Sequence, residues 1–319
     1  MSKCLVVFGA TGQQGSSVIT NVLNDPHLSQ TYKIRAITRA VDSPKAKALQ
    51  EQQNVQVVQG DVSNRASLEA ALTGAHTVFA MTTHSFSPAD VDADVDLEYA
   101  TGTAIADLAV QKGAQYIIFS TLPPVSSISG GKYTNVTPFD DKARIEQYIR
   151  GLPIKSAFTS LGSFMQNFEL PFFAPQKADD GTYVMARHTA PETKWPLLDA
   201  VSDAGKFVGA ILAEPDKYEG TTFCAAQALY SFEEMAAIIS EATGKTVVYK
   251  QIPLEEFKKT LVFGGDRFVE IFVEVFSSYA EFGYYGKDTE KEVAWAAANA
   301  RGKLTTYAEY VKAHPFHFE

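Results

Sequence analysis

The sequence predicts an α/β fold: a doubly wound parallel Rossmann sheet with a smaller C-terminal α/β lobe. Short apolar runs alternate with helix-like segments through about residue 160, the order that produces a parallel sheet with right-handed crossovers. Several runs are apolar at successive positions, which is typical of strands buried on both faces. A glycine-rich segment follows the first run, at the end of the strand where sheets of this class bind ligands.

The first half of the chain divides into strands and helices of ordinary length. We expect strands at residues 4–8, 33–38, 55–58, 76–81, 115–120 and 154–159. We expect helices near residues 15–24, 44–53, 65–73, 97–112 and 139–150. Residues 1–155 are therefore assigned to the Rossmann domain.

The pattern changes after residue 160, where aromatic residues and prolines gather between 164 and 196. Further helices are expected near residues 203–213, 231–243, 254–262 and 266–282. We expect residues 156–319 to form a smaller lobe over the C-terminal ends of the strands, with some segments returning to the sheet.

The composition limits the class of protein. The 319 residues are 45% hydrophobic and 20% charged, as in ordinary globular proteins, and the net charge of -9 argues against broad nucleic-acid binding. Cys4 and Cys224 are too few for a disulfide framework, which fits a reducing compartment. We expect neither a signal peptide nor a membrane span, because the first apolar run is short and no run approaches ~18 apolar residues, and we expect no metal site from the spacing of the histidines. We expect a cytoplasmic protein, with access to the nucleus left open.

The glycine-rich segment carries the main functional signal. Gly9 permits a tight turn, Gly12 lets the backbone approach a pyrophosphate, and Gly15 lets the following helix pack close to the sheet. The start of the helix offers free N–H groups and a positive dipole end to phosphates. A turn that merely needs glycine is disfavoured by the strand before it and the helix after it. The loop's remaining candidate cofactor contacts are Thr11, Gln13 and Gln14.

The end of the second strand indicates which dinucleotide binds. A site for NAD usually places an acidic residue here to bind the ribose hydroxyls. This chain has Arg39 instead, with Lys45 close behind. Arg39 can bind a 2′-phosphate through two parallel hydrogen bonds, so we expect NADP(H). A solvated surface arginine is the alternative.

Seven segments spread over the chain carry a recognisable pattern. They are GATGQQG at 9–15, ITRAVDSPKAKAL at 37–49, VVQGDVSN at 57–64, PFDDKARIEQYIR at 138–150, FMQNF at 164–168, VSDAGKFV at 201–208 and the tail near YAEYV. Together they resemble the NmrA-like family, and the resemblance runs almost from end to end. The glycine spacing is similar to that of extended and atypical short-chain dehydrogenases/reductases. The resemblance implies an NADP(H)-binding protein. Some members are regulators that read the ratio of NADPH to NADP⁺, and others are enzymes of small-molecule metabolism.

The resemblance also implies further cofactor contacts. Residues after the third strand would hold the adenine, and residues after the fourth would lie beside the inner ribose and the nicotinamide. The segment after the sixth strand would pass under the nicotinamide. The residues concerned are Asp61 and Val62, then Thr82, Thr83 and His84, then Phe164 and Asn167.

The catalytic set of the parent superfamily is incomplete. Its reductases use a serine and a Tyr-x-x-x-Lys pair, in which the tyrosine gives a proton to the carbonyl oxygen. Lys142 matches the lysine, and Ser120 or Thr121 matches the hydroxyl partner, but Pro138 stands where the tyrosine belongs. A proline side chain has no proton to give, so ordinary carbonyl reduction is in doubt.

A substitute acid is an open alternative. Tyr133 is the first candidate, because its loop should hang over the nicotinamide; His84, Asp140 and Asp141 are the others. The two aspartates also suit a first helical turn, where acids favour the dipole and can pair with Arg144.

Aromatic and apolar residues near the sixth strand allow two interpretations. Two roles are open for Phe164, Met165, Phe168 and Trp195. They either line a pocket for an aromatic ligand, guided by Asn167, or pack the two lobes together.

Two functions are consistent with these observations. The first is an NADP(H) sensor that acts on a regulatory protein partner. The alternative is an NADPH-dependent reductase or acid–base enzyme acting on a small secondary metabolite. A homodimer is left open.

Overall fold

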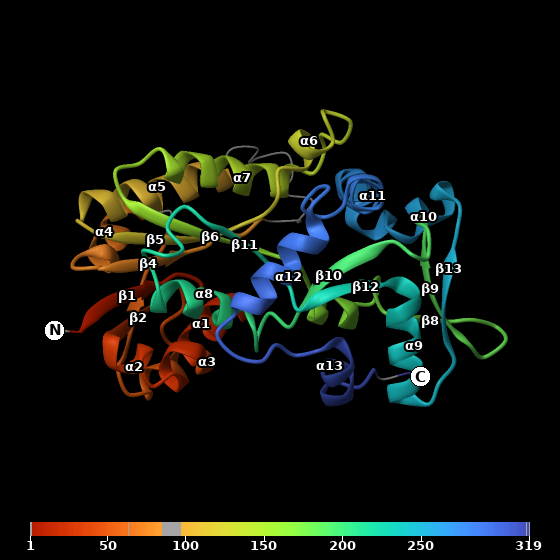
Figure 1. Ribbon diagram of the computed structural model, residues 1–319, viewed down its shortest axis with the longest axis horizontal. Helices are drawn as coiled ribbons and strands as arrows, with labels where there is room; N and C mark the ends of the chain where they lie inside the picture. Colours follow the sequence, from red (N-terminus) through yellow and green to blue (C-terminus); the bar gives the residue numbers. More distant parts are fainter. Residues whose placement is uncertain (1, 63, 85–96, 317, 319) are drawn as a thin grey trace.

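The computed structural model describes residues 2–62, 64–84, 97–316 and 318 (Figure 1). Its larger lobe is a parallel seven-stranded sheet in the order β11-β6-β5-β4-β1-β2-β3. The strands are β1 (Lys3–Val7), β2 (Tyr32–Thr38), β3 (Val55–Gln59), β4 (Thr77–Ala80), β5 (Tyr116–Thr121), β6 (Lys155–Leu161) and β11 (Thr222–Ala225). The strand order reverses between β1 and β4, which places a switch point beside the end of β1. The predicted fold class is confirmed.

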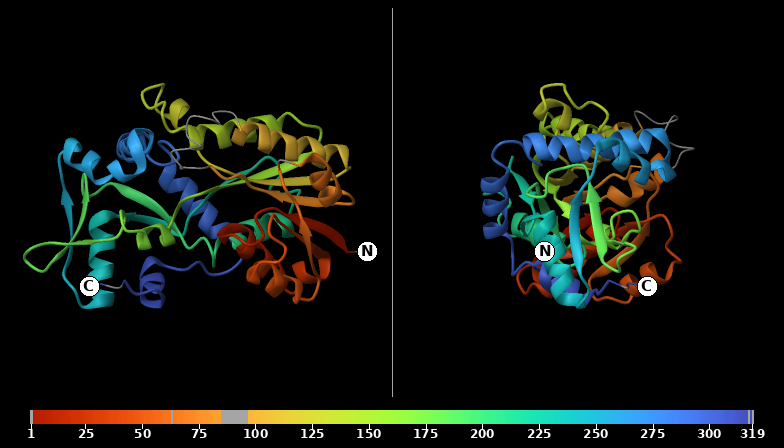
Figure 2. Two further views of the ribbon diagram at one scale, coloured as in Figure 1. Left: turned by 180° about the vertical axis from the view of Figure 1, so that it is seen from behind. Right: turned by 90° about the vertical axis from the view of Figure 1, so that its right-hand side faces the viewer.

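Helices cover both faces of this sheet (Figures 1 and 2). On one face α5 packs against α4 and α7, and on the other α1 packs against α8 and the short α2. The first layer is α4 (Arg65–Leu72), α5 (Leu97–Gln111) and α7 (Thr137–Arg150); the second is α1 (Gln13–Asn24), α2 (Leu28–Thr31), α3 (Pro44–Gln50) and α8 (Ala204–Ala213). The five helices expected before residue 155 all occur.

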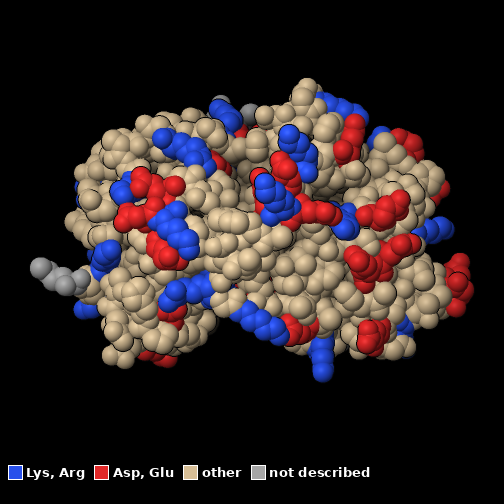
Figure 3. Space-filling view, in the orientation of Figure 1, with Lys and Arg blue, Asp and Glu red and all other residues tan. Residues whose placement is uncertain are grey.

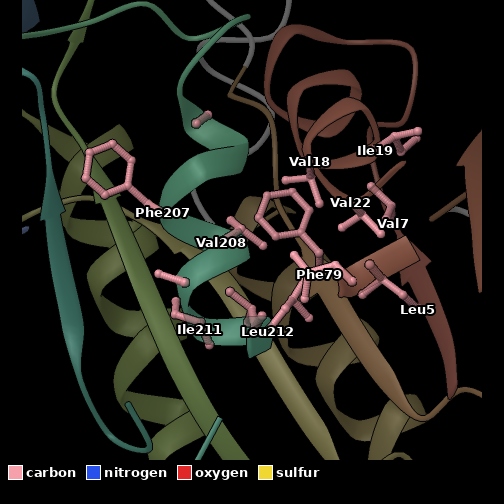
Figure 4. Packing of buried hydrophobic residues seen from close by; sticks show 14 of the residues in the cluster. Leu5, Val7, Val18, Ile19, Val22, Phe79, Phe207, Val208, Ile211 and Leu212 are labelled. Atoms are coloured by element: carbon pink, nitrogen blue, oxygen red, sulfur yellow. The ribbon is translucent and has the colours of Figure 1, made fainter. Parts of the chain in front are cut away.

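The close packing of α1 on α8 depends on small residues. A Cβ on Gly205 would lie 2.1 Å from the carbonyl oxygen of Ser17, so a larger residue there would push the helices apart. Apolar side chains fill the space between these helices and the sheet (Figure 4). Fully buried members of this core are Leu5, Val7, Val18, Val22, Phe79, Phe207 and Ile211.

The smaller lobe contains two three-stranded mixed sheets, ordered β12-β10-β7 and β13-β9-β8. Their strands are β7 (Ser163–Phe164), β8 (Gln176–Lys177), β9 (Tyr183–Arg187), β10 (Lys194–Leu198), β12 (Ala228–Ser231) and β13 (Val247–Gln251). The helices of this part are α9 (Phe232–Thr243), α10 (Leu254–Thr260), α11 (Gly265–Phe282), α12 (Thr289–Asn299) and α13 (Tyr307–Ala313), with the short α6 (Val125–Ile128) above α7 (Figure 1). The sequence pattern did not predict α12 or α13.

Segments from the second half of the chain also contribute to the large lobe. Strands β6 and β11 belong to the large sheet although both lie after residue 154 in sequence, and α12 packs against β11. The N-terminus lies at the far end of the large lobe, and the C-terminus lies on the small lobe (Figure 1). Within the described part of the chain, no helix is both long enough and apolar enough to span a membrane.

Candidate functional site

The glycine loop joins the end of β1 to the start of α1. Gly9 adopts a φ of +64°, a conformation that L side chains rarely take, and its carbonyl oxygen accepts from the amide of Gly12 at 2.9 Å. Gly12 is the N-cap of α1 and offers no side chain to the free amides of the first turn. A Cβ on Gly12 would meet only the oxygen of Gly9, at 3.3 Å, among the described atoms. The loop therefore turns sharply and leaves the helix N-terminus accessible.

The other loop residues lie around this helix N-terminus. Gly12 and Gln13 are exposed, and Thr11 and Gln14 are half-buried. The side-chain oxygen of Gln14 is buried and has no hydrogen-bond partner among the residues that the structure describes. A buried acceptor without a donor is costly and points to a missing partner such as water or a ligand.

The ends of β2 and β3 present a basic edge. Arg39 directly follows β2 and is exposed, as is Lys45 in the first turn of α3. The backbone oxygen of Arg39 accepts from the side chain of Gln59 at 3.5 Å, which joins the two strand ends. Asp61 and Val62 follow β3; the amide of Asp61 donates to Ser67 at 3.3 Å, and Val62 is 45% exposed. These four predicted residues thus lie at one edge of the sheet.

A compact polar cluster lies beyond the end of β4. The Lys142 ammonium on α7 donates to the backbone oxygen and the hydroxyl of Thr82, both at 3.0 Å, and forms an ion pair with Glu98. The Thr82 hydroxyl donates to Glu98 Oε1 at 2.6 Å. His84 Nδ1 lies 3.4 Å from Glu98 Oε2. The structure therefore brings together three of the predicted residues: Thr82, His84 and Lys142. Thr83, which lies between Thr82 and His84 in sequence, is exposed.

Burial and hydrogen bonds have opposite effects on the pKa of the Glu98 carboxyl group. Glu98 is only 6% exposed. Burial acts to raise the pKa of its carboxyl group, but hydrogen bonds from His84, Lys142 and Thr82 outweigh it and hold the pKa below the ordinary value. Burial lowers the pKa of Lys142, and the neighbouring Glu98 opposes that shift. The arrangement is a buried, hydrogen-bonded ion pair at the switch point of the sheet.

Glu98 was not predicted from the sequence as a site residue. It is 44 residues from Lys142 in sequence, and it stands in the first turn of α5, where an acid has the ordinary explanation of a favourable helix dipole. Its one sequence signal is that it is an acid at the head of an apolar helix that follows the fourth strand.

The remaining catalytic candidates lie elsewhere or have structural partners. Ser120 is buried in β5, and the neighbouring Thr121 hydroxyl donates to the backbone oxygen of Lys142 at 3.2 Å, which ties α7 to the sheet. Tyr133 donates its hydroxyl to Glu281 at 2.8 Å and packs edge-on against Phe282. Tyr133 is thus held at the C-terminal end of α11 rather than by the Glu98 cluster.

The acids of α7 also have partners. Asp140 accepts from the amide of Ser126 at 3.1 Å, and Asp141 pairs with Arg144 at 2.9 Å. Burial raises the pKa of both carboxyl groups. Pro138 is buried in the first turn of the helix, where proline suits the geometry because no amide hydrogen is needed.

The aromatic residues after β6 are mostly core residues. Met165, Phe168 and Trp195 are at most 3% exposed and belong to the core of the small lobe, where Trp195 packs on Phe276 with ring centroids 4.6 Å apart. Phe164 is half-buried and packs against the core of the large lobe. Of the two interpretations open from the sequence, packing accounts for the burial of these side chains. Asn167 is half-buried in the short 3-10 helix Met165–Glu169.

No group of three or more potential metal ligands occurs among the residues that the structure describes. On the face shown in Figure 3, lysine and arginine side chains lie among aspartate and glutamate side chains over both lobes.

Comparison with known proteins agrees with this architecture. The model of the NmrA-like family matches residues 1–311. An NmrA-like family domain-containing protein of Dictyostelium discoideum is 29% identical over 98% of both chains. The NmrA-like family domain-containing oxidoreductase FrzB of a Cladobotryum species is 30% identical over 79% of this chain and 77% of its own.

A solved structure extends the comparison. The crystal structure of NmrA, a negative transcriptional regulator, in complex with NAD has a TM-score of 0.78 at 25% identity, covering 98% of this chain and 94% of that one. The regulator's complex with NADP has a TM-score of 0.75 at 24% identity, with the same coverage. The resemblance seen in the sequence is thereby confirmed: the chain belongs to the NmrA-like family.

Proposed function

We propose that this chain binds NADP(H) and reports the redox state of that cofactor to a regulatory partner. Support for binding comes from the glycine loop, where the space beside Gly12 fits a pyrophosphate. The buried Gln14 oxygen, which has no partner within the described part of the chain, can accept a hydrogen bond from a water that hydrates the pyrophosphate. A regulator with the same fold has been solved with NAD and with NADP. The choice of NADP(H) rests on Arg39 and Lys45, two exposed cations where an acid would favour NAD.

The observation that carries the sensor function is the environment of Lys142. Four residues before it, where the superfamily's reductases place tyrosine, stands the buried Pro138. The Lys142 ammonium pairs with Glu98 and donates to both oxygens of Thr82. Bound NADPH supplies a hydride donor, but this helix offers no proton donor at position 138 to accompany it. We infer that the site favours holding the cofactor over transferring its hydride.

A reductase is the second candidate. It is favoured by the contact between His84 and Glu98, because an imidazole whose Nδ1 is held 3.4 Å from a carboxylate oxygen is positioned to serve as a general acid. The oxidoreductase FrzB shows that relatives of this family carry that description. An enzyme of this kind would act on a small secondary metabolite.

Hydride transfer and sensing can be separated in one experiment on the wild-type protein. NADPH consumption is followed with a broad panel of aldehydes, ketones and quinones, and backbone hydrogen exchange is compared with NADPH and with NADP⁺ bound. The sensor function predicts background consumption and two different exchange patterns. Rapid turnover of the panel would establish the reductase, and identical exchange patterns would remove the basis for sensing.

A further inference from the structure

Glu98 contacts every member of the polar cluster at the end of β4. We infer that Glu98 is a positioning residue, which fixes the Lys142 ammonium where the nicotinamide half of NADP(H) would bind. This inference rests on the proposed binding of NADP(H) to this chain. It assigns a role to a carboxylate that has no counterpart in the expected Ser–Tyr–Lys set.

The geometry shows how one carboxylate can orient the lysine. Oε1 of Glu98 receives the Thr82 hydroxyl at 2.6 Å and pairs with the Lys142 ammonium, while the same ammonium bonds both oxygens of Thr82 at 3.0 Å. An ammonium on a four-carbon stem has many rotamers in solution. Two oxygens of Thr82, which follows β4, and one of Glu98 on α5 select one of them here.

The surroundings argue that this pair does more than stabilise the fold. Removing two charges from water is costly, and replacing a buried ion pair by apolar residues is often neutral or stabilising. The Glu69–Lys112 pair, which joins α4 to the residue after α5, has a smaller cost because both side chains are about a third exposed. A buried pair kept at the switch point of the sheet therefore has its best explanation in the ligand that such points bind.

The test separates the two halves of the cofactor. Calorimetric titrations use NADPH and adenosine 2′,5′-bisphosphate, which carries only the adenine half with its 2′-phosphate. The variants are Glu98→Gln, which keeps the size and an acceptor oxygen but removes the charge, and Glu98→Asp, which keeps the charge. Glu69→Gln, on the partly exposed Glu69–Lys112 pair, is the matched control. Thermal unfolding of each variant monitors the fold.

Glu98→Gln should weaken NADPH binding by about tenfold or more, the scale of a lost hydrogen bond to a charged group. It should leave the affinity for adenosine 2′,5′-bisphosphate unchanged. Glu98→Asp should retain more NADPH affinity than Glu98→Gln, and Glu69→Gln should behave as the wild type. In a Lys142→Met background, Glu98→Gln should cause no further loss, because the carboxylate acts through the lysine.

Three results would overturn the inference. They are unchanged or tighter NADPH binding in Glu98→Gln, equal weakening of both ligands, and equal losses in Glu98→Gln and Glu98→Asp. A wild-type protein that binds neither ligand would instead refute the proposed function, and the inference with it. Normal wild-type binding of both ligands with any of the three results leaves the proposed function intact and removes only the role of Glu98.

Discussion

The Cα of Gly15 lies against the carbonyl group of Gly9: a Cβ on Gly15 would be 2.3 Å from that oxygen and 2.6 Å from its carbon. The first turn of α1 approaches the end of β1 this closely because residue 15 has no side chain. Gly12 differs, because a Cβ there would meet the same oxygen at 3.3 Å and no other described atom within 4 Å. The sequence assigned packing to Gly15 and ligand approach to Gly12, and the geometry of the loop suits both assignments.

Gly12→Val should abolish NADPH binding while the fold is kept. The backbone of Gly12 is extended, with φ −89° and ψ 176°, so a larger residue can adopt it, but its branched side chain would enter the space proposed for the pyrophosphate. Titration calorimetry and thermal unfolding measure the two effects. As a contrast, Gly15→Ala should lower the free energy of unfolding by about 1–3 kcal/mol through overpacking. A Gly12→Val protein that binds NADPH within a few-fold of the wild type would place the pyrophosphate elsewhere.

Arg39→Ala should weaken NADPH binding by about 1.5–3 kcal/mol, the range for a hydrogen bond to a charged group. The affinity for NADH should change little, because NADH has no 2′-phosphate. Both affinities can be measured by calorimetric titration. Arg65→Ala, at an exposed arginine that pairs with Glu69 on α4, serves as the control. Equal losses for NADPH and NADH would show that Arg39 does not read the 2′-phosphate.

Tyr133→Phe should leave NADPH binding unchanged, because the Tyr133 hydroxyl is bonded to Glu281 rather than to the Glu98 cluster. If a substrate is found, turnover should fall instead in His84→Gln, by ~10²–10⁴-fold for a positioned general acid. Steady-state rates for the two variants decide between the acids. A large loss of kcat in Tyr133→Phe, with normal NADPH affinity, would return the role of acid to Tyr133.

The free energy of unfolding should decrease as the pH falls from about 6.5 to about 4, because of His188. Burial, assisted by the neighbouring Arg187, lowers the pKa of His188 to about 4 in the folded state, while the unfolded side chain titrates near 6.5. The unfolded state therefore binds more protons in this range, and stability is lost as the pH decreases. Denaturant unfolding of wild type and His188→Gln at several pH values measures the difference, with His27→Gln at an exposed site as the control. The slope of stability against pH should be smaller in His188→Gln only; parallel curves for all three proteins would contradict the assignment.

The sequence predicted the large lobe well because its signals are local. Buried parallel strands read as continuous apolar runs, and all six expected strands occur within a few residues of their predicted ends. The small lobe was harder to predict: β7 and β8 have two residues each, too short for any periodicity. The Ala-rich helix α12 was detectable from its helix propensity and was missed.

In the candidate site, too, residues in local motifs could be predicted from the sequence, and residues brought together by packing could not. The glycine loop and the strand ends are local motifs, so Gly12, Arg39 and Thr82 could be proposed from the sequence. Glu98 joins Lys142 only through the packing of α5 on α7, which no spacing in the sequence encodes. Aromatic residues look alike in a pocket and in a core, so the burial of Phe168 and Trp195 in the small lobe had to come from the structure.

Titration calorimetry of the wild-type chain with NADPH and with NADH, under identical conditions, tests the central claim most directly. A dinucleotide site with Arg39 at the end of β2 predicts saturable binding of both, with NADPH tighter by about tenfold or more. Equal affinities, or no binding of either dinucleotide, would contradict it.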